Sequence, residues 1–196
     1  MNDNSMELIF ATNNVHKLEE INKLLSNKVL VHSLLEVGIS EDIPETGKTL
    51  NENASQKSWY IFNRLHKNCF ADDTGLEIEV LNNEPGVYSA RYAGEDKNSL
   101  KNMQKVLNKM DGLKNRNARF RTVISLIFDG KEYQFEGKIE GKIIDTPIGD
   151  KGFGYDPIFM PEGYTRTFAE LELDVKNSIS HRGIAVRKLA EFIVGL

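Results

Sequence analysis

The sequence reads RFRTVISLIFDGKEYQFEGKI from Arg119 to Ile139, and this stretch decides the class of fold. A long run rich in β-branched residues ends at Asp129-Gly130, a pair that favours the tight turn of a β-hairpin. We therefore predict that residues 132–139 return as the partner strand and that residues 141–144 extend it. Antiparallel strands thus dominate the middle of the chain.

Helices and strands alternate outside this hairpin. Hydrophobic periodicity predicts a strand at 7–12, helices at 15–25, 49–66, 98–110 and 180–194, and an irregular segment at 149–161. Early interleaving followed by hairpins predicts an α/β fold with a mixed sheet. The 196 residues fit one domain, 1–196, with two lobes.

Composition narrows the class of protein. The formal net charge of −4 argues against bulk attraction to nucleic acid. The single cysteine, Cys69, has apolar neighbours, which predicts a buried, inert thiol and a reducing, cytoplasmic setting. No apolar run approaches the roughly 20 residues of a membrane span, and no leader opens the chain, so we expect no membrane partner. The polar residues Met1 to Ser5 are expected to be a frayed end.

Two adjacent carboxylates, Asp72 and Asp73, stand out in the segment CFADDTGLEIEV at residues 69–80. We expect a buried strand to end before them, Gly75 to supply a turn, and residues 76–80 to form a half-buried strand. Two like charges at a strand tip are costly unless a cation offsets them, so the pair is a candidate site for Mg²⁺ and general-base chemistry. The alternative is an Asp-rich turn whose side chains bond nearby backbone N–H groups.

The segment Thr12-Asn13-Asn14-Val15-His16-Lys17 follows a predicted strand and opens a predicted helix. Unpaired backbone N–H groups at a helix N-terminus attract anions, and Lys17 adds a positive charge. The segment lacks the glycines and the ending of a Walker P-loop. The alternative is an Asn N-cap followed by an exposed helix lysine.

Glu45 and Lys57 are candidates for the same site as Asp73. Mg²⁺ usually takes one or two protein carboxylates, so Glu45 could complete a site if the fold brings it to Asp73. Lys57 shares a helix face with Asn53 and could bind phosphate or a water. Each residue also has an ordinary explanation, as a solvated loop acid and a solvated helix lysine.

Two later segments could hold a flat ligand. Gly152-Phe153-Gly154-Tyr155-Asp156-Pro157 places glycines beside two aromatic rings, which allows stacking, and Asp156 could accept from a ring N–H. In the segment 176–183, His181 and Arg182 fall in the first turn of a helix, where cations oppose the helix dipole. That cost suggests a ligand-binding use, although a buried structural turn and a structural histidine remain alternatives.

Together these segments resemble the inosine/xanthosine triphosphate pyrophosphatase family, and the resemblance covers nearly the whole chain in order. The matching motifs are Ala11-Thr12-Asn13-Asn14 to Lys17, Glu45-Thr46-Gly47, Glu52-Asn53-Ala54 to Lys57, Ala71-Asp72-Asp73-Thr74-Gly75-Leu76, Pro85 to Gly94, Gly152 to Phe159, Thr167-Phe168-Ala169-Glu170-Leu171 and Ser180-His181-Arg182-Gly183.

The resemblance implies an elongated mixed sheet with flanking helices, two lobes around a nucleotide cleft, and a homodimer. It implies Mg²⁺-dependent hydrolysis of ITP, dITP or XTP to the monophosphate and pyrophosphate. By position, Glu45 and Asp73 would bind Mg²⁺, Asp73 would activate water and Lys57 would support it. The implied substrate-binding residues are Thr12, Asn13, Asn14, Val15, His16, Lys17, Thr74, Phe153, Gly154, Tyr155, Asp156, Lys176, His181 and Arg182.

Hydrogen-bond chemistry explains how such a site would reject adenine. Hypoxanthine and xanthine carry a carbonyl at C6, where donors such as Arg182 and the His181 region would pair, whereas adenine would leave those donors unmet. An unmet buried donor costs about 1–3 kcal/mol. Exclusion of guanine must rest on its 2-amino group. The chain departs from the family pattern at Asn13, usually Gly, at His16, often small, and at Thr74, more commonly Ser.

Two other functions compete with this interpretation. A pyrophosphatase of the Maf type would share the fold but take pyrimidine or methylated nucleotides, and the segments at 153–156 and 180–182 argue against it. A nucleotide-binding regulator without turnover is the second, and the intact set of Glu45, Asp73 and Lys57 argues against it.

Overall fold

In a computed structural model of the chain, residues 6–25 and 29–195 are described. The expected frayed end, Met1 to Ser5, lies outside the described residues. No helix in the described part of the chain is long and apolar enough to cross a membrane.

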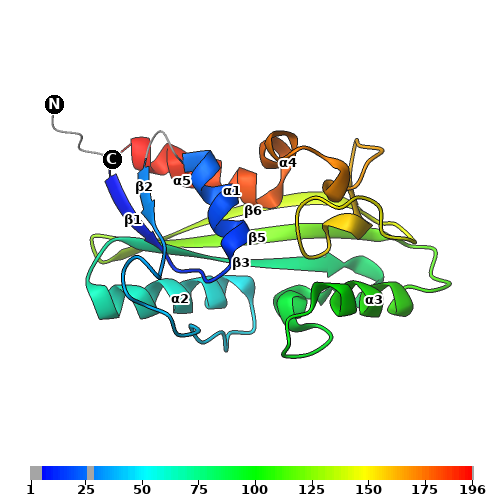
Figure 1. Cartoon of the computed structure of the whole chain (residues 1–196), viewed down its shortest axis with the longest axis horizontal. Coiled ribbons are helices and arrows are strands. Elements are labelled where there is room, and N and C mark those ends of the chain that lie inside the picture. The colour runs from blue at the N-terminus through cyan, green and yellow to red at the C-terminus, as the bar shows by residue number, and fades with distance from the viewer. Residues whose placement is uncertain (1–5, 26–28, 196) are drawn as a thin grey trace. The chain divides into compact units, whose positions relative to one another are not determined.

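The strands of the described residues pair into a seven-stranded sheet (Figure 1). Its order is β2-β1-β3-β5-β6-β7, and the short β4 pairs with β3. β1 pairs with β2 and β3 in parallel, whereas the β3–β4 and β6–β7 pairs are antiparallel. The strands are β1 (Met6–Phe10), β2 (Val29–His32), β3 (Cys69–Ile78), β4 (Glu84–Pro85), β5 (Asn117–Phe128), β6 (Lys131–Ile143) and β7 (Phe159–Pro161). The predicted mixed α/β fold is confirmed.

Five α-helices accompany the sheet in the described residues: α1 (Val15–Leu25), α2 (Leu50–Leu65), α3 (Ser99–Lys109), α4 (Leu173–Ile179) and α5 (His181–Val194). The four predicted helices are confirmed within two residues at each end. α2 begins at a capping box in which the Thr49 hydroxyl accepts from the Glu52 N–H and the Glu52 carboxylate accepts from the Thr49 N–H. The edge strand β2 and the short helix α4 were not predicted, because neither carries a long periodic pattern.

The predicted hairpin is also confirmed. Asp129 and Gly130, between β5 and β6, have φ values of 48° and 75°, the left-handed backbone that a two-residue turn needs. β6 continues without a break to Ile143, as the sequence of residues 141–144 suggested.

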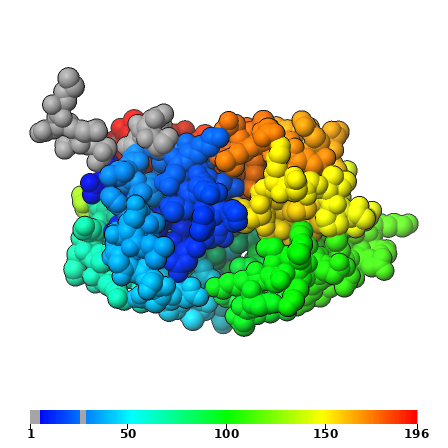
Figure 2. Space-filling model, in the orientation of Figure 1, coloured from blue at the N-terminus to red at the C-terminus, as the bar shows by residue number. Residues whose placement is uncertain are grey.

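The chain forms two compact units, which we describe separately. Unit 1 comprises residues 1–73, 122–137 and 183–196, and unit 2 comprises residues 74–121 and 138–182. Strands β3, β5 and β6 each contribute residues to both units. Figure 2 shows α1, in blue, on the visible surface of unit 1, in keeping with the 64% exposure of Val15.

Unit 1 buries apolar side chains on both faces of its strands. On one face, Phe10 and Phe70 stack at 4.6 Å and pack with apolar residues of α1 and α5. On the other face, Ile9, Cys69 and Ala71 pack with apolar residues of α2. Successive residues of β3 therefore point alternately toward α1 and α5 and toward α2.

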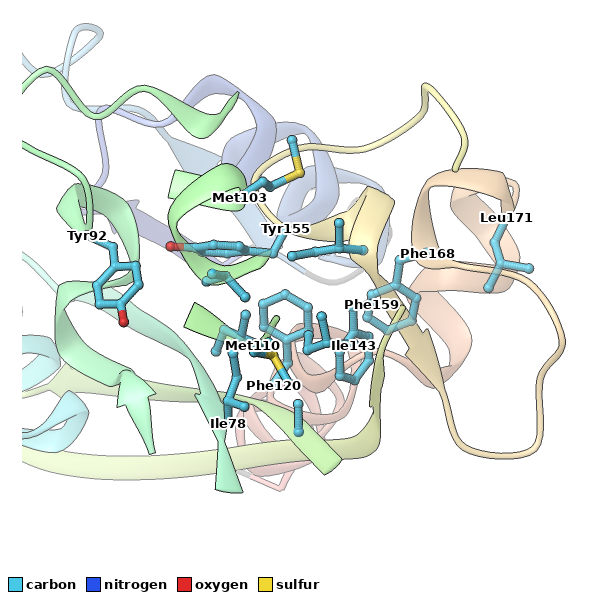
Figure 3. Packing of buried hydrophobic residues seen from close by; sticks show 14 residues of the cluster. Ile78, Tyr92, Met103, Met110, Phe120, Ile143, Tyr155, Phe159, Phe168 and Leu171 are labelled. Carbon is cyan, nitrogen blue, oxygen red and sulfur yellow. The ribbon is translucent and has the colours of Figure 1, made fainter. Parts of the chain in front are cut away.

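Unit 2 has one apolar cluster, which Figure 3 shows from close by. Phe120 of β5 lies 4.7 Å from Phe159 and 6.0 Å from Phe168, centroid to centroid. Met110, next to the end of α3, and Tyr155, from the segment before β7, join them. The irregular segment at 149–161 thus includes buried side chains and the short strand β7, and is not wholly irregular.

The predicted turn at Gly75 is wrong, because β3 runs without interruption from Cys69 to Ile78. Gly75 serves close packing: a Cβ there would lie 2.7 Å from the Gly86 carbonyl oxygen. Glu77 is also buried, where we expected a solvent-facing residue of a half-buried strand. Arg119, at 2.6 Å, and Arg121, at 3.5 Å, pair with its carboxylate.

Substitution Gly75→Ala should therefore lower the free energy of unfolding by about 1–3 kcal/mol, because backbone atoms must move to admit the methyl group. Urea unfolding measures the loss. Gly195→Ala is the matched control, since its Cβ would meet nothing nearer than 3.5 Å, and we expect a change within about 0.5 kcal/mol. Equal stability of the two variants would contradict the close-packing role.

Candidate active site

The loop between β1 and α1 has a fixed shape. The Asn14 side-chain oxygen accepts from the Lys17 N–H at 3.2 Å, which caps α1, and the Thr12 hydroxyl accepts from the Asn14 N–H at 3.2 Å. The loop is held by its own polar side chains at the positive end of the α1 dipole. This is the geometry of an anion-binding helix N-terminus.

Three predicted substrate-binding residues beside this site, one in the loop and two at the start of α1, have other surroundings. The Asn13 amide donates to the Glu41 carbonyl at 3.3 Å and to Asp42 at 3.2 Å. Asn13 does not have a positive φ, so its replacement of the usual glycine needs no left-handed backbone. Val15 and His16 are exposed, and His16 lies 3.8 Å from Glu19. The Asn13 side chain is therefore committed to residues 41 and 42.

The adjacent carboxylates of β3 separate onto the two faces of the sheet in unit 1. Asp72 accepts from the Lys17 ammonium of α1 at 2.9 Å. Asp73 accepts from the Asn53 amide of α2 at 3.0 Å and lies 3.7 Å from the Lys57 ammonium. Alternation along the strand thus assigns each carboxylate to its own helix.

Lys57 joins Glu45 to Asp73. Its ammonium lies 2.5 Å from a Glu45 oxygen and 3.7 Å from an Asp73 oxygen, and only 8% of its side chain is exposed. Asn53, one turn earlier on α2, accepts from the Gly47 N–H at 2.8 Å while donating to Asp73. Two residues of α2 therefore tie the loop that carries Glu45 to the carboxylate of Asp73.

Burial and charge act against each other in this group. Burial raises the pKa of Asp73 and outweighs the opposing attraction of Lys57 and Lys17. Burial alone would lower the pKa of Lys57, but the charges of Asp73, Glu45 and Asp72 raise it above its ordinary value. The group therefore holds an excess of negative charge in a poorly hydrated place, which favours an added cation.

The donor set of this group fits Mg²⁺. No cluster of three or more His, Cys, Asp or Glu side chains suited to a metal occurs in the described residues. Mg²⁺ does not need one, because it takes one or two carboxylates and completes its shell with water and phosphate oxygens. Glu45 and Asp73, which meet at one ammonium, supply that number.

Unit 2 holds a second set of predicted residues around the Phe153 ring. The Asp156 carboxylate accepts from the Phe153 N–H at 2.8 Å and from the Lys176 ammonium at 2.7 Å. Lys176 lies 5.0 Å and Arg182 5.5 Å from the ring centroid. Asp156 is thus committed to holding its neighbours, and the ring is flanked by two cations.

Arg182 and His181 occupy the first turn of α5, in unit 2. Arg182 is 1% exposed and donates to the Thr74 hydroxyl at 3.2 Å. His181 is 3% exposed and stacks on Phe120 at 4.6 Å with an interplanar angle of 13°. Packing and hydrogen bonding therefore fix both side chains in the interior of unit 2.

Two further predicted substrate-binding residues, Tyr155 and Gly154, lie in the segment before β7, and Cys69 begins β3. Tyr155 lies in the core of unit 2 and donates to the Ser89 carbonyl at 2.8 Å, and burial raises the pKa of its hydroxyl. Gly154 has a left-handed backbone, with φ of 65°. Cys69 is buried, which confirms that part of its prediction, and burial raises the pKa of its thiol to about 12, so little of it is thiolate at neutral pH.

The sequence indicated most of these residues but missed two relationships. Asn53 was noted only as a neighbour of Lys57 on one helix face, whereas it bonds directly to Asp73. The Lys17–Asp72 pair was not anticipated at all. The four-residue spacing of Asn53 and Lys57 was a usable signal for the first, but no local signal links Lys17 and Asp72, which are 55 positions apart.

The mixed α/β fold and the two groups of polar residues are those of a known protein family, which the comparison with known sequences identifies. A model of the Ham1 family matches residues 8–192, and the chain belongs to that family.

Individual relatives are similar along almost their whole length. A dITP/XTP pyrophosphatase from Flavobacterium johnsoniae is 50% identical over 188 residues, covering 96% of this chain and 98% of the relative. Another from Flavobacterium psychrophilum is 51% identical over 187 residues, covering 95% and 98%. The solved structure of a HAM1 protein from Coxiella burnetii has a TM-score of 0.90 at 38% identity and covers 97% of this chain and 100% of its own. The Staphylococcus aureus Ham1 protein has a TM-score of 0.88 at 40% identity, covering 96% and 98%.

Proposed function

We propose that this protein hydrolyses deaminated purine nucleoside triphosphates, namely dITP, XTP and ITP, to the monophosphate and pyrophosphate. The observation that carries the proposal is the group in which Glu45 meets the buried residues Lys57, Asn53 and Asp73. It combines a general base with a cation site in one place. The names of the relatives supply the substrate class.

The site residues of unit 1 bind the phosphate groups and carry out the hydrolysis in this proposal. The N-terminus of α1, with Thr12, Asn14 and Lys17, binds the phosphate groups. Asp73 orients a water and accepts its proton as the water oxygen bonds to phosphorus and the bond between the α and β phosphates breaks. Lys57 keeps Asp73 and Glu45 in place. Bound Mg²⁺ supplies neutralisation of the phosphate charge, with Glu45 and Asp73 as its protein ligands.

The residues of unit 2 select the base. Phe153 offers a ring for stacking, and the Arg182, His181 and Lys176 side chains are donors that suit the carbonyl groups of hypoxanthine and xanthine. Adenine presents an amine at C6 and would leave a buried donor unmet. Thr74 and Asp156 hold Arg182 and Lys176 in position.

Three further features belong to the proposal. Mg²⁺ is the metal, because the site offers two carboxylates and no soft ligand. The protein works in the reducing cytoplasm, which suits its single buried thiol. It is a homodimer, as its resemblance to the family implies, and light scattering measures that state directly.

The test is pyrophosphate release from dITP, XTP, ITP, dATP and dGTP with Mg²⁺ and with EDTA. We expect release from the first three, at least about tenfold slower release from dATP and dGTP, and none above background with EDTA. Release from none of the deaminated nucleotides would refute the enzyme. Preference for a pyrimidine nucleotide would support the Maf-type alternative instead.

A further inference from the structure

Asp72 is a buried carboxylate for which the proposed reaction has no task. It is 1% exposed, and it lies beside Asp73 in a strand where a second negative charge is costly. Its partner is the Lys17 ammonium, at 2.9 Å, whose side chain is 14% exposed. A charge kept at such a cost calls for an explanation beyond packing.

The place of Lys17 on α1 is unfavourable for a positive charge. Lys17 is the third residue of α1, where the helix dipole disfavours a cation. The ammonium group at the end of a lysine side chain ordinarily extends into water. The buried Asp72 carboxylate instead draws the Lys17 ammonium back toward the sheet.

The fold gives Asp72 this role through the alternation of β3. Phe70, two residues earlier on the strand, packs in the cluster that includes Ile21 and Leu25 of α1. Asp72 therefore points to the α1 face, and Asp73 to the α2 face. Asp72 meets Lys17 of α1, beside the proposed phosphate site, and Asp73 meets Lys57 of α2, at the proposed cation site.

We propose that Asp72 is a positioning residue that fixes the Lys17 ammonium for binding the triphosphate. This rests on the proposed function, because it assigns to Lys17 the phosphate contact stated there. In this role Asp72 touches neither substrate nor metal and acts through Lys17.

A double-mutant cycle with Asp72→Asn and Lys17→Met tests this role. We expect Asp72→Asn to lower kcat/KM for dITP about tenfold and to weaken calorimetric binding of inorganic pyrophosphate by a similar factor. In the Lys17→Met background the same substitution should change either quantity less than about twofold, because the ammonium that Asp72 holds is gone. Asp96→Asn is the matched control: it breaks an exposed Lys–Asp pair of 2.6 Å, and we expect no change.

The outcomes separate this role from others. A tenfold loss in both backgrounds would overturn the positioning role, as would weaker Mg²⁺ binding by Asp72→Asn in the Lys17→Met background. Absence of pyrophosphate release by the wild-type protein would instead refute the proposed function. Thermal unfolding guards against misfolding, because the double variant lacks both charges and should be at least as stable as Lys17→Met alone, which leaves Asp72 buried without its ammonium.

Discussion

Asp73→Asn should reduce pyrophosphate release from dITP by at least about 10³-fold while leaving the protein folded. Asparagine keeps the shape and can still accept the hydrogen bond that Asn53 donates at 3.0 Å. It cannot take a proton from water, and it is a poor ligand for Mg²⁺. The measurement is single-turnover pyrophosphate release at saturating substrate.

Stability gives a second, independent measurement of Asp73. Because burial raises the pKa of Asp73, the native state binds its proton more tightly than the unfolded state does. Without metal, the wild-type protein therefore loses stability as the pH rises through the raised pKa, whereas Asp73→Asn does not. We expect the variant to be no less stable than the wild type at neutral pH. Mg²⁺ should raise the Tm of the wild type and leave that of the variant unchanged.

Near-normal turnover in Asp73→Asn would contradict its assignment as base and ligand. If Asp73→Asn is folded and inactive but still gains stability from Mg²⁺, the result would support Asp73 as the general base and contradict its role as a metal ligand. Asp96→Asn serves again as the control, because it makes the same chemical change at an exposed aspartate that is paired with Lys101 and has no role in the proposed site.

Lys57→Met should have the second-largest effect, on both stability and rate. The substitution leaves the Glu45 and Asp73 carboxylates, of which 25% and 10% are exposed, without the ammonium between them. Breaking a buried ion pair by removing one partner costs about 3 kcal/mol, and we expect urea unfolding at neutral pH to show it. Misplacement of the two carboxylates should lower kcat about 100-fold.

The pH dependence identifies the cause of that loss. Neighbouring carboxylates raise the pKa of Lys57, so its contribution is complete below the ordinary value of 10.5 and is lost as the pH rises through the raised pKa. The difference between wild type and Lys57→Met should therefore shrink in strong alkali. Lys101→Met is the matched control, since Lys101 is 63% exposed in its pair with Asp96, and we expect less than about 0.5 kcal/mol. A loss that is the same at all pH values would indicate lost packing only.

Local chemistry made several elements predictable. Asp129-Gly130 favours one turn whatever surrounds it, and β5 and β6 therefore follow from the sequence. The Thr49 capping box fixes the start of α2 for the same reason. The residues proposed for the site were also recognisable, because their types and order match those of a family.

Long-range packing defeated the prediction at Gly75. A glycine after two aspartates is typical of a turn, but this one is required by the Gly86 backbone that packs against it. Glu77 alternates with apolar residues, a pattern typical of a residue that faces water. In the structure it is buried and pairs with Arg119 and Arg121 of β5, a strand that is far away in sequence but adjacent in the sheet. Neither neighbour can be identified from the residues around positions 75 and 77.

The sequence by itself determined that Asp72 and Asp73 are adjacent, but it predicted a turn at a place where the structure has both residues on one strand, with successive side chains on opposite faces. Only the tertiary structure decided what each face offers. α1 brings Lys17 to Asp72, and α2 brings Asn53 and Lys57 to Asp73. The physical reason is that a carboxylate's role depends on the charges and burial around it, and here those come from helices packed on the sheet, far away in the chain.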